Sequence, residues 1–324
     1  MSVIPNALIP NVVICGVRKC GTTALFRWLQ AHPDVCASTA KETQFLMDRD
    51  SPYYDPEFGV HDVGIDGYAH FFGEWSGERF RMEASSRYYD QETALDVLSS
   101  LDEPPHVVFV VREPVERLES AFHYAKNNRG TLREGVTLAE FVEAAGNGDV
   151  RELLAISVDS KFGQSVSNEV SQLAKEVDYG HYARRLAHWR DRYPHDRLHV
   201  LLFEDLRRDP RQFVQGLAGR VGLDASFYED FVFRKENRTV AMRSLRVHRM
   251  MRRLAQFVPR NSWTRSVYGL YLKVQGRPPG KATANEDTRK QLRALYADSN
   301  SELAAMFDLD LTAWNAGAVK QVTA

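Results

Sequence analysis

The stretch Gly16-Val-Arg-Lys-Cys-Gly-Thr-Thr23 decides the fold that this sequence predicts. It follows Asn11–Cys15, a short β-branched run typical of a buried strand, and precedes Ala24–Leu29, which places its apolar side chains on one helical face. A strand, a glycine-bearing loop and a helix in this order open a phosphate-binding unit. We expect the backbone N–H groups of the loop to hold an anion at the helix N-terminus.

The loop departs in one position from the Walker A pattern, G-x-x-x-x-G-K-[ST]. Gly16 and Gly21 have the Walker spacing, and Thr23 stands at the Ser/Thr position. Thr22 occupies the place of the Walker lysine, whereas Lys19 comes three residues earlier. A nucleoside triphosphatase needs that lysine on the β- and γ-phosphates. The displaced lysine therefore predicts a positive charge beside a different transferred group.

The remaining pattern alternates strands with helices. Three further runs read as strands: Val35–Ala37, His106–Val111 and Leu198–Phe203. Pro114 begins one helix, and Tyr182–Arg192 forms another. Such alternation predicts an α/β fold, a three-layer sandwich with a central parallel sheet and a P-loop-like turn. We expect one domain over residues 1–324, with a looser helical excursion around 127–180.

Bulk composition excludes several classes of protein. Of the 324 residues, 44% are hydrophobic and 26% charged, which is typical of a globular chain. Apolar runs are too short to span a bilayer, and Met1–Pro10 holds no Lys or Arg, so we expect neither a transmembrane segment nor a secretory signal, and a cytoplasmic protein. The three cysteines have no partners at zinc spacing, so a disulfide framework or a metal is not expected.

Charge is concentrated late in the chain. Residues 234–293 hold sixteen Lys or Arg against three acids, although the net charge of the chain is −1. This segment includes 242–258, which reads as a basic amphipathic helix. Such a helix packs on the core with a solvated basic face, or contacts an anionic or lipid-linked acceptor. Nucleotide phosphates, nucleic acid and a membrane surface are the other anions compatible with the charge.

The phosphate loop resembles the 5′-phosphosulfate loop of sulfotransferases that use 3′-phosphoadenosine 5′-phosphosulfate (PAPS). It is most similar to the heparan sulfate branch, whose loop reads G-V-R-K-G-G-T-R. The resemblance implies that the donor is bound by the following loop residues: Arg18, Lys19, Cys20, Gly21, Thr22 and Thr23. It also implies that PAPS is a co-substrate and that no metal is required.

Two later segments are similar to the family's contacts with the 3′-phosphate. Arg112 follows a predicted strand and Ser120 stands eight residues further on, as in the family's 3′-phosphate motif. The planar fork of an arginine suits a phosphate. Arg277 stands where the family has its K-G-R loop, and the resemblance implies that it contacts the same phosphate.

The candidate base is Glu42. Lys41-Glu-Thr-Gln-Phe-Leu46 resembles the family's K-E-x-x-F-F segment, whose glutamate is the proposed catalytic base, and an attacking hydroxyl must lose its proton. The segment Glu83-Ala-Ser-Ser-Arg-Tyr-Tyr89 falls where the family has E-K-S-P-A-Y-F, with Ala84 in place of the lysine. We expect Lys41 and Arg87 to contact the acceptor. The alternative bases are three histidines: His61, His70 and His123.

The sequence thus predicts an enzyme that moves a sulfuryl group from PAPS to a hydroxyl by in-line displacement, with Glu42 as base and Lys19 stabilising charge. A glycan, a glycolipid and a secondary metabolite remain open as acceptors, and no nucleic-acid partner is expected. Two rival functions are a P-loop small-molecule kinase and a non-catalytic protein that binds nucleic acid or a membrane surface. Magnesium-dependent ATP turnover would favour the first, and salt-dependent DNA binding without nucleotide binding the second.

Overall fold

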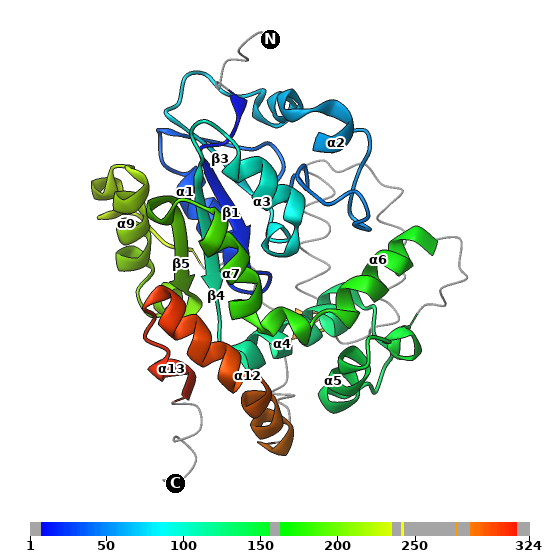
Figure 1. Ribbon diagram of the computed structural model, residues 1–324. Coiled ribbons are helices and arrows are strands. Elements are labelled where there is room, and N and C mark those ends of the chain that lie inside the picture. Colours follow the sequence, from blue (N-terminus) through cyan, green and yellow to red (C-terminus); the bar gives the residue numbers. More distant parts are fainter. Residues whose placement is uncertain (1–7, 156–162, 235–240, 243–275, 278–285, 316–324) are drawn as a thin grey trace. The chain divides into compact units, whose positions relative to one another are not determined.

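The computed structural model describes residues 8–155, 163–234, 241–242, 276–277 and 286–315 (Figure 1). Contacts divide the chain into two compact units. The first comprises Met1–Glu113, His181–Asn237 and Ala297–Ala324, and the second comprises Pro114–Gly180 and Arg238–Tyr296. The phosphate loop and the candidate base both belong to the first unit.

A five-stranded parallel sheet forms the centre of the first unit. Its order is β2-β3-β1-β4-β5, and every neighbouring pair is parallel. The bounds of its strands are β1 (Val12–Gly16), β2 (Val35–Ala37), β3 (Phe80–Ala84), β4 (His106–Val111) and β5 (Leu198–Leu202). All five residues of β1 are buried, as are the last five of β4. Burial of consecutive residues means that both faces of the sheet are covered, which explains the continuous apolar runs.

Helices surround this sheet in the first unit (Figure 1). Phe109 on β4 packs edge-on against Trp189 of α7, with ring centroids 4.9 Å apart. The bounds of the helical elements are α1 (Thr22–Gln30), α2 (Val60–Val63), η2 (Ile65–Phe72), η3 (Tyr88–Asp90), α3 (Glu92–Ser99), α7 (Tyr182–Arg192), η7 (His195–Arg197), α8 (Phe203–Arg208), α9 (Pro210–Val221), η8 (Ala225–Tyr228) and α13 (Thr312–Asn315). The long helix α12 (Glu286–Phe307) has residues in both units.

The second unit is mainly helical. Its elements are α4 (Pro114–His123), η4 (Tyr124–Arg129), α5 (Leu138–Gly146), η5 (Arg151–Leu153), α6 (Gly163–Ala174), η6 (Asp178–Gly180) and the short antiparallel pair β6 (Ala241–Met242) and β7 (Gly276–Arg277). Phe122 and Phe141 belong to its apolar core. A buried ion pair lies in this unit, with Arg117 Nη1 2.7 Å from Glu176 Oε2. Burying an ion pair costs desolvation, so it requires close geometry.

The predicted α/β fold with a central parallel sheet is confirmed. Strands lie at or within one residue of the predicted positions, and helices begin at Pro114 and Tyr182 as predicted. Strand β3 was not predicted, because Arg81 and Glu83 interrupt its apolar character. The predicted basic helix at 242–258 lies almost wholly outside the described residues. None of the helices in the described ranges combines the length and the apolar character that crossing a membrane requires.

Candidate active site

The loop between β1 and α1 is shaped to hold an anion. Gly21 caps the N-terminus of α1 with a φ of +85°, and a Cβ there would stand 3.0 Å from the ring of Phe203. Lys19 also has a left-handed backbone, with a φ of +69°. The first N–H groups of a helix lack intrahelical acceptors, and the first turn of α1 carries no acidic residue. The loop therefore offers donors and positive charge without an internal counter-ion in that turn.

Arg112 lies beside this loop at the end of β4. Its Nη1 donates to the carbonyl oxygen of Lys19 at 3.5 Å, and its guanidinium stacks over the ring of Phe203, 4.7 Å from the centroid. The hydroxyl of Tyr182 donates to the Arg112 carbonyl at 2.8 Å. Next to it, the N–H of Glu113 donates to Glu204 Oε1 at 3.1 Å. The end of β4 is thus fixed against the phosphate loop by side chains from α7 and α8.

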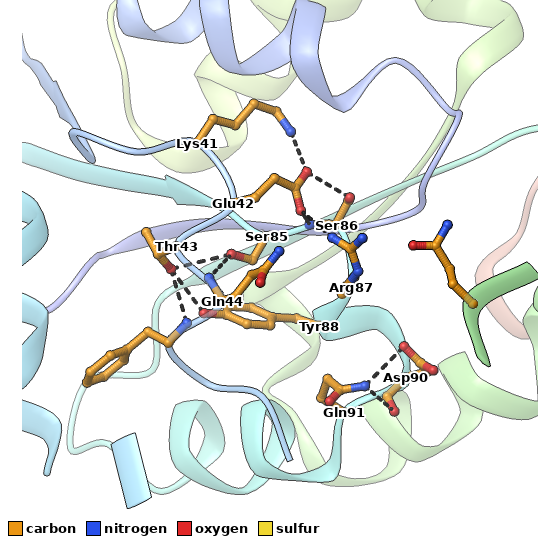
Figure 2. Close-up of polar contacts among 12 residues, drawn as sticks. Lys41, Glu42, Thr43, Gln44, Ser85, Ser86, Arg87, Tyr88, Asp90 and Gln91 are labelled. Carbon is orange, nitrogen blue, oxygen red and sulfur yellow. Dashed lines mark hydrogen bonds and ion pairs between the residues drawn. The ribbon is translucent and has the colours of Figure 1, made fainter. Parts of the chain in front are cut away.

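The carboxylate of Glu42 is surrounded by cations and donors (Figure 2). Lys41 Nζ lies 2.5 Å from Oε1, and Arg87 Nη1 lies 3.8 Å from Oε2. Ser86 donates through its backbone N–H to Oε2 at 3.0 Å and through its hydroxyl to Oε1 at 2.8 Å. Burial acts to raise the pKa of Glu42, but these charges and hydrogen bonds outweigh it and hold the pKa below its usual value. Glu42 is therefore ionised at neutral pH.

The candidate base lies close to the phosphate loop, because the segment after β2 that carries it is hydrogen-bonded to the end of β3, the strand that pairs with β1. Strands β1 and β3 pair in parallel, with Ile14 opposite Ala84. A Cβ placed on Gly16 would stand 3.5 Å from the carbonyl oxygen of Ser86, whose hydroxyl holds Glu42. The Glu42 N–H donates to the Ala84 carbonyl at 2.7 Å. One edge of the sheet thus carries both the loop and the carboxylate.

A second carboxyl group, Glu83, is fully buried close to the same segment. Thr43 Oγ1 donates to Glu83 Oε2 at 2.7 Å, while Ser85 Oγ accepts the N–H of Gln44 and Tyr88 OH that of Leu46. Burial raises the pKa of Glu83 to about 7, although hydrogen bonds, from Thr43 first, counter part of this effect. Sequence reasoning named Glu83 as a match to the family but gave it no role. A charged residue within a strand was the available signal.

The other predicted loop residues lie where the motif suggests. Cys20 and Thr22 are buried, and Arg18 and Thr23 are partly exposed. Cys20 Sγ donates to the Arg18 carbonyl at 3.5 Å. Arg18, Lys19, Cys20 and Gly21 thus lie between β1 and α1, and Thr22 and Thr23 are the first two residues of α1.

Two predicted contacts with the 3′-phosphate belong to the second unit. Ser120 lies on α4 and is partly exposed. Arg277 lies on β7, where its backbone is paired with Ala241, and its side chain is outside the described set. Their roles stay predictions.

The three alternative bases occupy other positions. His61 Nε2 lies 3.1 Å from Thr93 Oγ1, His70 stacks on Phe58 at 4.9 Å, and His123 is on α4 of the second unit. The groups that surround Glu42 come instead from Lys41 and the segment after β3. Within the described ranges, no group of three or more His, Cys, Asp or Glu side chains is arranged to hold a metal ion.

Comparison with known proteins assigns the class. Residues 10–256 match the family described as the sulfotransferase domain, so the chain belongs to that family. The human bifunctional heparan sulfate N-deacetylase/N-sulfotransferase 1 is 24% identical over 310 residues, covering 92% of this chain and 29% of that protein. The human heparan sulfate glucosamine 3-O-sulfotransferase 3B1 is 25% identical over 213 residues, covering 66% of this chain and 45% of that protein.

A solved structure shares the fold. The sulfotransferase from Alicyclobacillus acidocaldarius aligns with a TM-score of 0.64 and 22% identity, covering 94% of this chain and 98% of that one. The match over residues 10–256 confirms the family predicted from the motifs, and its distant relatives include heparan sulfate enzymes. The chain spans less than a third of the length of the N-deacetylase/N-sulfotransferases that it matches.

Proposed function

We propose that this chain transfers the sulfuryl group of PAPS to the hydroxyl of a glycan, a glycolipid or a secondary metabolite. The observation that carries the proposal is the placement of an ionised carboxylate, Glu42, beside an anion-binding loop that carries Lys19. The loop offers backbone donors and one lysine, which suits a 5′-phosphosulfate. A Cβ on Gly21 would stand 3.0 Å from the ring of Phe203, so glycine allows the loop to pack closely against α8 in its left-handed conformation.

The reaction is a single displacement at sulfur. The acceptor oxygen forms a bond to sulfur as the bond between sulfur and the bridging phosphate oxygen breaks. Glu42 takes the acceptor's proton, and 3′-phosphoadenosine 5′-phosphate (PAP) leaves with the bridging oxygen. Lys19 and the loop N–H groups stabilise the negative charge that develops on that oxygen. Arg112 binds the 3′-phosphate, which takes no part in bond breaking.

The charge near the base favours a neutral acceptor over a heparan-like polyanion. Residues 48–66 hold six Asp or Glu and one Arg. This stretch is joined to the base segment, because the Val60 N–H donates to the Phe45 carbonyl at 3.0 Å. Lys41 and Arg87 both pair with Glu42. A polyanion approaching here would meet carboxylates, and like-charge contacts oppose binding.

Two measurements test this function. Calorimetry should show that PAP binds far more tightly than AMP, because only PAP carries a 3′-phosphate. A transfer assay with labelled PAPS against a panel of neutral and anionic hydroxyl compounds, read by mass, should give a sulfated neutral product. Equal affinity for PAP and AMP, or magnesium-dependent ATP turnover without sulfuryl transfer, would contradict the proposal.

A further inference from the structure

The segment that carries the candidate base has an unfavourable backbone. Glu42 has a φ of +65° and Gln44 a φ of +57°, so two residues with side chains lie in the left-handed region. Such a conformation is unfavourable for a residue with a side chain and persists only where the surroundings impose it. Something must therefore hold residues 42–46 in place.

The restraint comes from residues 85–88, which lie against this segment (Figure 2). Ser85 Oγ accepts the Gln44 N–H at 3.1 Å, and Tyr88 OH accepts the Leu46 N–H at 3.0 Å. Thr43 Oγ1 lies 3.4 Å from Ser85 Oγ and 3.2 Å from Tyr88 OH. The Thr43 hydroxyl therefore lies at the centre of the contacts that fix the two backbone N–H groups.

Glu83 determines the direction of these hydrogen bonds. An ionised carboxylate only accepts, so Thr43 donates its proton to Glu83 Oε2. The Thr43 oxygen also lies within hydrogen-bond distance of the hydroxyls of Ser85 and Tyr88, which in turn accept backbone N–H groups. Each bond polarises the next, so the loss of one member weakens the set.

We propose that Glu83 is a positioning residue for sulfuryl transfer, which through Thr43 fixes the backbone of residues 42–46 and so aims Glu42 at the acceptor hydroxyl. The inference rests on the proposed role of Glu42 as base. Glu83 itself is buried on β3 and acts through Thr43.

The charge of Glu83 changes near neutral pH. Burial, partly countered by hydroxyl donors, raises its pKa to about 7. The titratable groups facing it are Cys15 on β1, Tyr68 in η2 and Tyr88 in η3, and each has a pKa raised well above its usual value, first by burial. They are neutral at pH 7, so Glu83 is the group of this set that titrates there. The hydrogen bond from Thr43 is stronger when Glu83 is ionised than when it is protonated, because it is then charge-assisted. Turnover should therefore rise as pH increases through about 7.

The experiment compares Thr43→Val, Thr43→Ser and Glu83→Gln with the control Thr93→Val, which removes a partly exposed hydroxyl on α3. Thr43→Val should lower kcat by about 10- to 100-fold, as expected for a misplaced base, with PAP affinity close to wild type. Thr43→Ser should restore most of the rate. Glu83→Gln should lose the rise in kcat between pH 6 and pH 8.

A double-mutant cycle separates this inference from the role of the base. In a Glu42→Gln background, Thr43→Val should have little further effect, because the group that it misplaces is gone. If Thr43→Val keeps full turnover while Glu42→Gln is impaired, the positioning role of Glu83 is overturned and the base role of Glu42 stands. An additive loss in the double variant, or an unchanged pH profile in Glu83→Gln, would overturn it as well. Full turnover of Glu42→Gln would remove the base role and this inference together.

Discussion

The guanidinium of Arg87 lies 3.8 Å over the ring of Tyr53 and also 3.8 Å from the Oε2 atom of Glu42. The ring therefore holds the cation where it acts on the carboxylate. Stacking of an arginine on an aromatic face depends on its planar shape, which lysine lacks. Arg87 stands where the heparan-like motif has alanine, and here it serves the candidate base.

Replacement of Arg87 should change the pH dependence of the reaction. Arg87 lowers the pKa of Glu42, so Arg87→Gln raises that pKa and moves the acid limb of the pH–rate profile to higher pH. Arg87→Lys keeps the charge without the stacking and should give a smaller displacement. Profiles of kcat/KM at saturating PAPS measure both. An acid limb that moves to lower pH in Arg87→Gln would contradict the assignment.

Removal of the base should slow the chemical step. Glu42→Gln keeps the shape of the side chain and removes its basicity, so kcat should fall by about 10² to 10⁴. PAP affinity should remain near wild type, since Glu42 does not touch the donor in this mechanism. The exposed Glu229→Gln is the matched control. Single-turnover kinetics and calorimetry report the two quantities, and a rate loss explained by weaker PAP binding would refute the base role.

Lys19 and Arg112 should have separable effects. Lys19→Ala should reduce kcat by at least about 100-fold, because its charge matters most as the sulfur–oxygen bond breaks. Arg112→Ala should weaken PAP binding by about 10- to 100-fold through the loss of charge-assisted hydrogen bonds. Arg208→Ala, with a side chain 72% exposed, is the control. Equal losses of affinity with unchanged kcat in both variants would disprove this division.

Glu83 should make stability depend on pH. Its folded pKa of about 7 lies above the ordinary value of 4.5, so the folded state binds the proton more tightly. The contribution of Glu83 to the free energy of unfolding is therefore largest below pH 4.5. It falls by roughly 3 kcal/mol as pH rises through about 7. Glu83→Gln should remove that fall. Urea unfolding of both proteins at pH 5 and pH 8 measures the difference, and the same pH dependence in both would contradict the assignment.

Much of the fold followed from short local patterns. Val107–Val111 is apolar throughout because it is buried on both faces, and the loop Gly16–Thr23 is recognisable because its two glycines have the spacing typical of a phosphate-binding loop. Strand β3 escaped prediction because Glu83 interrupts its pattern. The burial that makes this carboxyl group tolerable comes from residues distant in sequence.

The candidate site was predicted in part. Adjacency in the sequence was enough to place Lys41 beside Glu42. Arg87 stands 45 positions later in the chain and contacts the same carboxylate from the segment after β3. Tyr53 was not named at all, because a tyrosine in a loop carries no signal of its own. Contacts made by neighbouring strand ends need the sheet order, and local patterns do not specify it.

The ring of Phe203 supports two functions at once, since it fills the space over Gly21 and lies under the guanidinium of Arg112. A smaller side chain at position 203 would leave a gap over Gly21 and remove the aromatic face on which the guanidinium of Arg112 stacks. A side chain at position 21 would displace the ring and with it the arginine. Substitutions at positions 21, 112 and 203 should therefore be coupled in their effects, so that a change at one of them is tolerated only with a compensating change at another.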